Sequence, residues 1–222
     1  DQLLEFKQKV EEIHDRDASD RVSMIKEIEH LKELNQQVSA DAANLTEALR
    51  GSNKMQGLWG EMVLSRLLEA SGLRSGKEFS VQVSCKSEGG ATFQPDVLIH
   101  LPEDRTVIID AKVSLKAFAD AHNAPDGAPK QQLIKQHLDS IRKHVNLLSA
   151  KQYHQLTGSG SLDFVLLFIP IEGAFQLAVT QDPEILVGAM HKKVILASPS
   201  TLLAILRRSE EHTSELQSLA YL

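Results

Sequence analysis

The sequence predicts a mixed α/β sheet with helices on its faces, preceded by a long coiled-coil helix. Three observations predict this class. Apolar side chains in the first 50 residues recur at alternating spacings of four and three. Residues 163–169 contain a continuous apolar run, from Phe164 to Ile169, as expected for a strand buried on both faces. Between these segments, helix-like and strand-like patterns alternate, which is typical of a sheet covered by helices.

Composition narrows the class of protein. The 222 residues are 42% hydrophobic, which is enough for a real core. The single cysteine, Cys85, excludes an intramolecular disulfide and a cysteine cage for zinc, and favours a reducing, cytoplasmic compartment. No run of 18 apolar residues occurs, so we expect no membrane span in this sequence.

Charge is distributed unevenly along the chain. The net charge is −6, of which residues 1–50 carry −5 (7 Lys/Arg against 12 Asp/Glu) and residues 208–222 carry −2. Residues 51–207 are therefore close to neutral, at +1. This balance neither supports nor excludes a nucleic-acid partner, and a local basic groove on the middle block is compatible with it.

Residues 1–50 show a heptad seam. From Met24 the apolar seam continues to Leu49 and includes one polar residue, Asn35, of the kind that often sets register and strand number. One interpretation is a single amphipathic helix packed on its own domain. We favour a self-associating coiled coil, and hence a homo-oligomer, because the other faces of this helix are almost wholly polar.

Residues 51–207 contain the patterns of a globular domain. Gly51 and Asn53 are expected to end the coil. The elements that we expect after them are a helix at 57–70 with Leu58, Val63, Leu64, Leu67 and Leu68 buried, strands at 79–84, 96–101 and 106–112, a loop at 121–129, a helix at 130–149, a strand at 163–169, a helical stretch at 173–189 broken at Pro183, a strand at 194–197 and a helix from 200 to 207.

Three charged residues fall on two consecutive expected strands. Asp96 opens the first strand, and Asp110 and Lys112 close the next one beyond a tight turn. If the strands pair as a hairpin, both carboxylates come to the same end of the sheet, where a divalent metal is one reason to gather them. A structural salt bridge is the alternative interpretation. Glu61 lies in the preceding helix, where it either completes the site or serves as a helix-start charge.

The pattern Pro95-Asp96, Asp110-x-Lys112 and a preceding helical glutamate resembles that of PD-(D/E)XK nucleases. Longer stretches resemble the RmuC family, whose members are bacterial proteins implicated in DNA recombination. These stretches are residues 57–64, 68–73, 95–97, 109–115, 148–153, 168–175 and 194–203. The resemblance implies a restriction-endonuclease-like fold, Mg²⁺-dependent (or Mn²⁺-dependent) DNA cleavage, and a longer coil with an N-terminal inner-membrane anchor outside this sequence.

The resemblance also implies roles for individual residues. The expected metal ligands are Glu61, Asp96 and Asp110. Lys112 is expected to be the base that activates water or faces the phosphate. Lys151 and Tyr153 are expected to contact the DNA phosphate. Glu172 is expected either to support the metal ligands from behind or to be purely structural.

The sequence predicts three segments and leaves two alternative functions. We expect a partial coiled coil at 1–50, a C-terminally truncated nuclease-like domain at 51–207, and a non-native tail at 208–222, which resembles a translated sequencing adapter. The first function is a metal-dependent DNA nuclease in a DNA recombination protein. The second is a non-catalytic DNA-binding or scaffolding protein that keeps the nuclease fold. The intact set of acids and lysine favours the first.

Overall fold

A computed structural model describes residues 53–82, 85–86, 92–101, 105–111, 115–151 and 161–206. The coiled coil expected at 1–50 and the tail expected at 208–222 lie outside these residues. The expected strand at 79–84 and the turn after residue 101 are described only in part. Among the described residues, no helix combines the length and the apolar character needed to cross a membrane.

The first described helix, α2 (Asn53–Ala70), is longer at its N-terminus than expected. Asn53 is the first residue of α2, and Gly51, the other residue expected to end the coil, lies outside the described residues. Gly57 costs a helix interior about 1 kcal/mol relative to alanine. Burial of the neighbouring Trp59 side chain offsets that cost, so the helix continues through the glycine. The helix ends at Ser71-Gly72, as predicted, where Gly72 adopts a φ of 88°.

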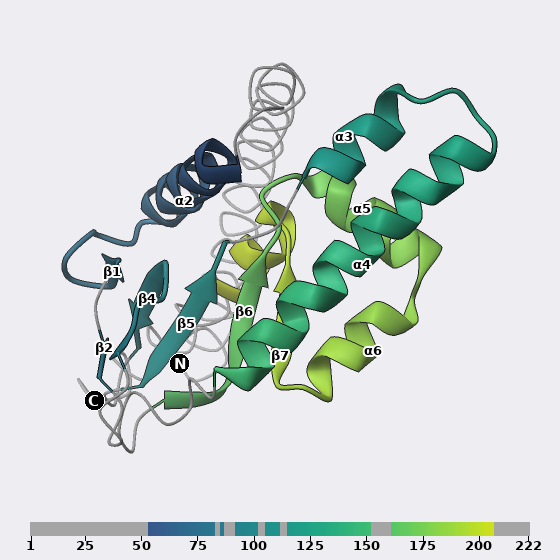
Figure 1. The fold of residues 1–222 in the computed structure, drawn as a ribbon. Coiled ribbons are helices and arrows are strands. Elements are labelled where there is room, and N and C mark those ends of the chain that lie inside the picture. Colours follow the sequence, from purple (N-terminus) through teal and green to yellow (C-terminus); the bar gives the residue numbers. More distant parts are fainter. Residues whose placement is uncertain are drawn as a thin grey trace, which may run out of the picture. The chain divides into compact units, whose positions relative to one another are not determined.

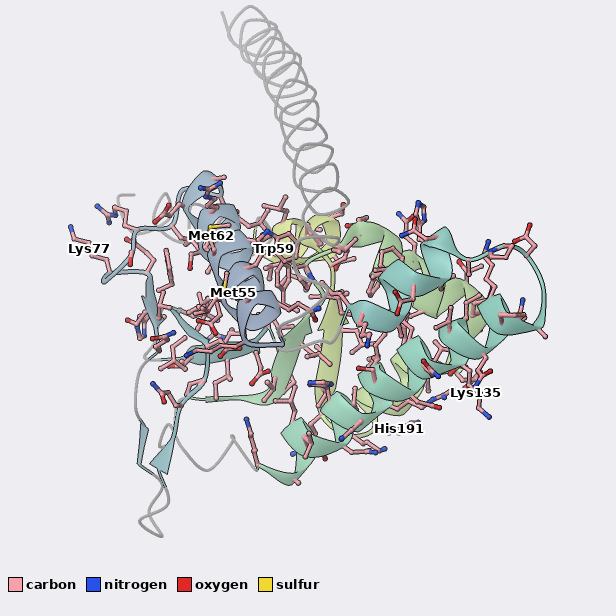
Figure 2. All side chains as sticks on the ribbon, turned by 45° about the horizontal axis from the view of Figure 1, so that its top comes forward. Met55, Trp59, Met62, Lys77, Lys135 and His191 are labelled. Carbon is pink, nitrogen blue, oxygen red and sulfur yellow. The ribbon has the colours of Figure 1, made fainter. Side chains whose placement is uncertain are left out.

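One face of α2 is buried and another is exposed. The predicted core positions Val63, Leu64, Leu67 and Leu68 are all buried. Leu58 was expected to join them but is 47% exposed, on a stripe that it shares with Met55 and Met62. These three residues are spaced i, i+3 and i+7, so they follow one side of the helix. Met55 and Met62 are labelled on α2 in Figure 2, together with the buried Trp59.

The main sheet has the strand order β1-β4-β5-β6-β7. Its strands are β1 (Phe79–Val81), β4 (Val97–His100), β5 (Thr106–Asp110), β6 (Ser161–Phe168) and β7 (Val194–Ala197). The first three pair antiparallel and the last three pair parallel. The predicted mixed α/β sheet flanked by helices is therefore confirmed. A second, two-stranded sheet of β2 (Cys85–Lys86) and β3 (Thr92–Phe93) was not predicted.

The parallel strands are joined through helices, as parallel pairing requires. These are α3 (Lys116–Asn123), α4 (Ala128–Ala150), α5 (Glu172–Gln181) and α6 (Glu184–Met190), followed by a helical segment at 199–206. The helical stretch broken at Pro183 is confirmed. The predicted loop at 121–129 was wrong at both ends, because residues 121–123 end α3 and Pro129 occupies the first turn of α4. Proline is tolerated there because its missing N–H would have no helical partner.

The core of the domain lies between the sheet and these helices. The inward side of α4 is formed by Ile134, His137, Leu138, Ile141, Val145 and Leu148, which are all buried. The apolar run in β6 is buried from Val165 to Phe168, as expected for a strand covered on both faces. In Figure 1, α2 lies beside the β1-β4-β5 half of the sheet, whereas α4 and α6 lie beside β6 and β7.

The register brings several strand ends to one edge of the sheet. Val97, at the start of β4, pairs with Ile109 near the end of β5. Asp110 pairs with Leu167 in β6, and Phe168 pairs with Ala197 in β7. The start of β4 and the ends of β5, β6 and β7 therefore share an edge. In open α/β sheets, ligands bind outside the carboxyl ends of the strands.

Candidate functional site

The pairing of β4 with β5 brings Asp96, the residue before β4, close to Asp110 at the end of β5. Because Val97 pairs with Ile109 in an antiparallel ladder, the next position of the register places Asp96 opposite Asp110. Side chains of directly opposed residues lie on the same face of a sheet. The hairpin predicted from the sequence is thus present, and it brings these two predicted site residues together.

A hydrogen bond orients the Asp96 carboxylate. Its Oδ2 accepts a 2.8 Å hydrogen bond from the backbone N–H of Ala111. Ala111 has just left β5, so its amide takes a side-chain acceptor at the point where the strand ends. The bond ties the start of β4 to the end of β5 and sets the direction in which the Asp96 carboxylate points.

Asp110 is almost completely buried, and a cation lies beside it. Its side chain is 5% exposed, and Oδ2 lies 3.7 Å from Nζ of Lys151, whose side chain is 42% exposed. Lys151 follows directly after α4 and is thereby brought to the acid pair. Burial of a carboxylate is costly unless a charge or hydrogen bonds compensate it, and Lys151 provides part of that compensation. The structure thus brings Lys151 together with Asp110.

Glu61 lies on α2, next to a close contact between the helix and β5. A Cβ atom on the preceding residue, Gly60, would lie 3.2 Å from the Ala111 carbonyl oxygen. The Glu61 Oε2 atom accepts a 2.8 Å hydrogen bond from the side-chain amide of Gln82. The backbone N–H of Gln82 in turn donates to the carbonyl oxygen of Asp96 at 2.9 Å. Gln82 therefore connects Glu61 with the segment that contains Asp96.

The acid pair fits a small hard cation in its chemistry. Mg²⁺ takes oxygen ligands, keeps several waters and is usually held by one or two carboxylates together with a substrate phosphate. Asp96 and Asp110 offer such a pair. The described residues contain no group of three or more His, Cys, Asp and Glu side chains arranged to hold a metal ion. The assignment of Glu61 as a third ligand stays a prediction.

Glu172 takes part in a separate network at the same edge of the sheet. Its Oε1 accepts a 3.0 Å hydrogen bond from the hydroxyl of the buried Ser198, and its Oε2 accepts a 3.2 Å bond from the Ser200 amide. The carboxylate therefore binds the start of the helical segment at 199–206, where helix-end amide donors need acceptors. These contacts are those of a structural acid, one of the two roles predicted for it.

Two predicted site residues, Lys112 and Tyr153, lie outside the described residues. Their roles stay predictions from the resemblance. Sequence reasoning also missed two members of the neighbourhood, namely Gln82 and the backbone amide of Ala111. The only sequence signal for Ala111 is its place directly after Asp110. Gln82 carries no motif, because its partners come from α2 and from the segment before β4.

Comparison with known proteins identifies the family of this chain. A family model described as the RmuC family matches residues 1–218. A Vibrio cholerae relative named "DNA recombination protein RmuC homolog" is 42% identical over 226 residues, which cover 99% of the chain and 44% of the relative. A homologue of the same name from Pseudomonas aeruginosa is 48% identical, covering 93% of the chain and 46% of the relative.

The "DNA recombination protein RmuC" of Escherichia coli K12 is 44% identical over 207 residues, with 93% of the chain and 44% of that protein covered. The chain thus spans less than half the length of these relatives. The family match includes part of the segment 208–222 that we expected to be non-native. Because the family model covers nearly the whole chain, the chain belongs to the RmuC family, as its sequence stretches predicted.

Proposed function

We propose that residues 51–207 form a Mg²⁺-dependent DNA nuclease domain of a DNA recombination protein. Three relatives bear the name DNA recombination protein RmuC or RmuC homolog. The observation that supports the proposal most strongly is that the Asp96 carboxylate, just before β4, accepts a hydrogen bond from Ala111, the residue after buried Asp110, while the Lys151 amine lies 3.7 Å from Asp110. Carboxylate oxygens are the ligands that Mg²⁺ prefers, so a divalent cation is a suitable partner for the pair.

In this proposal the chain's own residues divide the work. Asp96 and Asp110 hold Mg²⁺ (or Mn²⁺), and the hydrogen bond from Ala111 keeps the Asp96 carboxylate in place. When bound, the ion supplies positive charge at the DNA phosphate and favours deprotonation of water. Lys112 is the base, and Lys151 and Tyr153 contact the phosphate. The products are a phosphate monoester end and a hydroxyl end.

Calorimetry tests the site directly. We expect the 222-residue chain to bind Mg²⁺ or Mn²⁺, and Asp110→Asn to lose that binding because a neutral amide is a poor ligand for a hard cation. Asp139→Asn is the matched control, because Asp139 is exposed and lies twelve residues before Lys151, about 18 Å along the helix axis. Equal metal binding by the wild type and Asp110→Asn would remove the proposed site.

Cleavage assays separate the nuclease from the alternative, a non-catalytic DNA-binding scaffold. Linear, hairpin and branched DNA are incubated with Mg²⁺ or Mn²⁺ and with wild type, Lys112→Ala or Asp139→Asn. The nuclease proposal requires cleavage by the wild type and Asp139→Asn, and its loss in Lys112→Ala with DNA binding retained. Binding without cleavage in all three proteins would favour the scaffold.

We also propose that the intact protein is a homo-oligomer held by the segment 1–50, acts on DNA in the cytoplasm, and is anchored to the inner membrane by a segment outside this sequence. The heptad seam in residues 1–50 supports self-association. Analytical ultracentrifugation of the 222-residue chain and of a 51–222 variant tests it. We expect an oligomer for the first and a monomer for the second. If both contain the same number of chains per particle, the coil is not the cause of the association.

A further inference from the structure

Three exposed lysines gather where the turn between α6 and β7 meets α4. Lys192 and Lys193 end that turn, directly before β7. The Nζ atom of Lys192 donates a hydrogen bond to the side-chain Oδ1 of Asn146 on α4. Lys143 lies three positions before Asn146, so the two side chains are neighbours on the surface of the helix. We call Lys143, Lys192 and Lys193 the lysine cluster, and all three are exposed.

The positive charge of the lysine cluster is not cancelled by acids. In the described part of the chain, none of its three amines forms an ion pair with a carboxylate. Asn146 is neutral, so it holds the Lys192 amine and leaves both the charge and two N–H donors for another partner. Asp139 and Asp182, two acids near this surface, both bind Arg142. Because residues 51–207 carry only +1 in total, the cluster is a local concentration of charge.

The backbone of Lys193 adopts an unusual conformation. Its φ is 58°, in the left-handed region that glycine adopts easily and that is unfavourable for lysine. Its amide donates to the Met190 carbonyl oxygen at 2.9 Å, and its carbonyl oxygen accepts from the Val165 amide at 3.0 Å, so both ends of the residue are held. Glycine is the usual residue in this conformation after a helix. A lysine retained at such a position indicates a task for its side chain.

The lysine cluster lies a short way along α4 from the candidate site. Lys151, whose amine is 3.7 Å from Asp110, follows Asn146 by five positions, which is about 7.5 Å of helix rise. Phosphates of one DNA strand are spaced about 3.4 Å apart along the axis of a duplex. A strand with one phosphate at Lys151 can therefore present another, about two nucleotides away, at the level of Asn146.

We propose that the lysine cluster binds the phosphate backbone of the DNA that flanks the candidate site. This inference rests on the proposed function, in which Lys151 contacts the phosphate that is cleaved. Lysines act on DNA as point charges that neutralise phosphates and release counterions, and they do not read its sequence. Asn146 is a positioning residue, because it holds the Lys192 amine and does not itself supply charge. Anionic lipid would suit the same charges, but α4 places the cluster in line with Lys151, which favours DNA.

The salt dependence of DNA binding tests the proposal. The affinity of the 222-residue chain for a short fluorescent duplex is measured by anisotropy in EDTA, which prevents metal-dependent cleavage, between about 50 and 200 mM salt. We expect the double variant Lys192→Gln/Lys193→Gly to bind about tenfold more weakly at the low salt concentration. Its plot of log affinity against log salt should be shallower by about 1.8, because each lost phosphate contact removes about 0.9.

Two single variants separate charge from folding. Lys193→Gly removes the amine and relieves the left-handed backbone, so its melting temperature should match or exceed that of the wild type while its salt slope falls by about 0.9. Lys77→Gln is the matched control, because Lys77 is exposed and lies at the other end of the domain from His191, which precedes Lys192 (Figure 2). Its DNA affinity and salt slope should be those of the wild type.

Each other outcome overturns a definite part of the proposal. If the double variant binds DNA like the wild type, the lysine cluster is not a DNA contact and the proposed function stands. If Lys77→Gln weakens binding as much as Lys193→Gly, net charge is the cause and the cluster is overturned. If only binding to phosphatidylglycerol vesicles depends on the cluster, its partner is a membrane surface. If DNA binding depends on the cluster but the wild type cleaves no DNA with Mg²⁺ or Mn²⁺, the nuclease fails and the cluster stands. If the wild type binds no DNA, both fail.

Discussion

The Asp96 carboxylate binds the backbone amide of Ala111, the residue directly after Asp110, through a 2.8 Å hydrogen bond. Ala111 is buried, so its backbone amide could not bond to water in place of this acceptor. The side chain of Asp96 thus has a structural part as well as its proposed part in metal binding, and suitable substitutions separate the two.

We expect Asp96→Asn to be about 1 kcal/mol more stable than Asp96→Ala, because asparagine keeps an oxygen that accepts from Ala111 while alanine leaves the buried amide unpaired. Urea unfolding of the three proteins measures the difference. Both variants should lose metal binding, because both lose the carboxylate. Equal stability of the two variants would show that the hydrogen bond has no net effect.

The ion pair between Lys151 and Asp110 should be weak but measurable. Lys151 is 42% exposed, so water screens the pair, and we expect a coupling of about 0.5–1 kcal/mol in a double-mutant cycle of Lys151→Met and Asp110→Asn. The coupling should shrink in 1 M salt. The pair of Lys130 with the 94% exposed Asp126 is the control and should couple less. A larger coupling in the control pair would contradict this expectation.

Two glycines of α2 should respond to alanine in opposite ways. Gly57 has no atom within 4 Å of an added Cβ, so Gly57→Ala should stabilise the protein by up to about 1 kcal/mol through helix propensity. In Gly60→Ala the new Cβ would lie 3.2 Å from the Ala111 carbonyl oxygen, a backbone atom that cannot rotate away. We expect Gly60→Ala to be at least about 1 kcal/mol less stable than Gly57→Ala in urea. Equal gains would show that α2 moves away from β5 without cost.

His137 should make the protein less stable in mild acid. Its ring is fully buried, Nε2 lies 2.9 Å from the Ala174 carbonyl oxygen, and Nδ1 has no partner in the described structure. Burial lowers the pKa of His137 from its usual 6.5. As pH falls below about 6.5, the unfolded chain therefore takes up a proton more readily than the folded one, and stability falls by up to about 1.4 kcal/mol per pH unit.

Urea unfolding between pH 8 and pH 5 measures this effect as the difference between wild type and His137→Leu. The wild type should lose stability relative to the variant only on the acid side of pH 6.5. His191→Gln is the control, because His191 is exposed (labelled in Figure 2), and it should follow the wild type. A pH-independent difference between the wild type and His137→Leu would contradict the assignment.

Glu172 should matter for stability and not for metal binding. Glu172→Ala removes the acceptor of the buried Ser198 hydroxyl and of the Ser200 amide, and we expect a loss of about 1–2 kcal/mol. Glu184→Ala, which also removes an acid from the first turn of a helix, should cost less. Mn²⁺ affinity should be unchanged in both. A selective loss of Mn²⁺ binding in Glu172→Ala would give this residue a part in the metal site.

The sequence predicted those parts of the site that depend on local pairing. Asp96 and Asp110 could be placed together because a strand, a short connection and a second strand predict a hairpin. Gln82 could not, because its conformation and both of its bonds depend on tertiary contacts. The eight-residue helix α3 is too short for its periodicity to stand out. Leu58 was assigned to the core because hydrophobicity alone does not show which side of α2 faces the sheet.

The antiparallel pairing of β4 with β5 also has a consequence for how the domain assembles. Fourteen positions separate Asp96 from Asp110, so a local hairpin suffices to bring them together, and such contacts form early because little chain entropy is lost. Lys151 reaches Asp110 only after the chain has passed through α3 and α4. A nascent chain would therefore gather its negative charges before the compensating amine arrives.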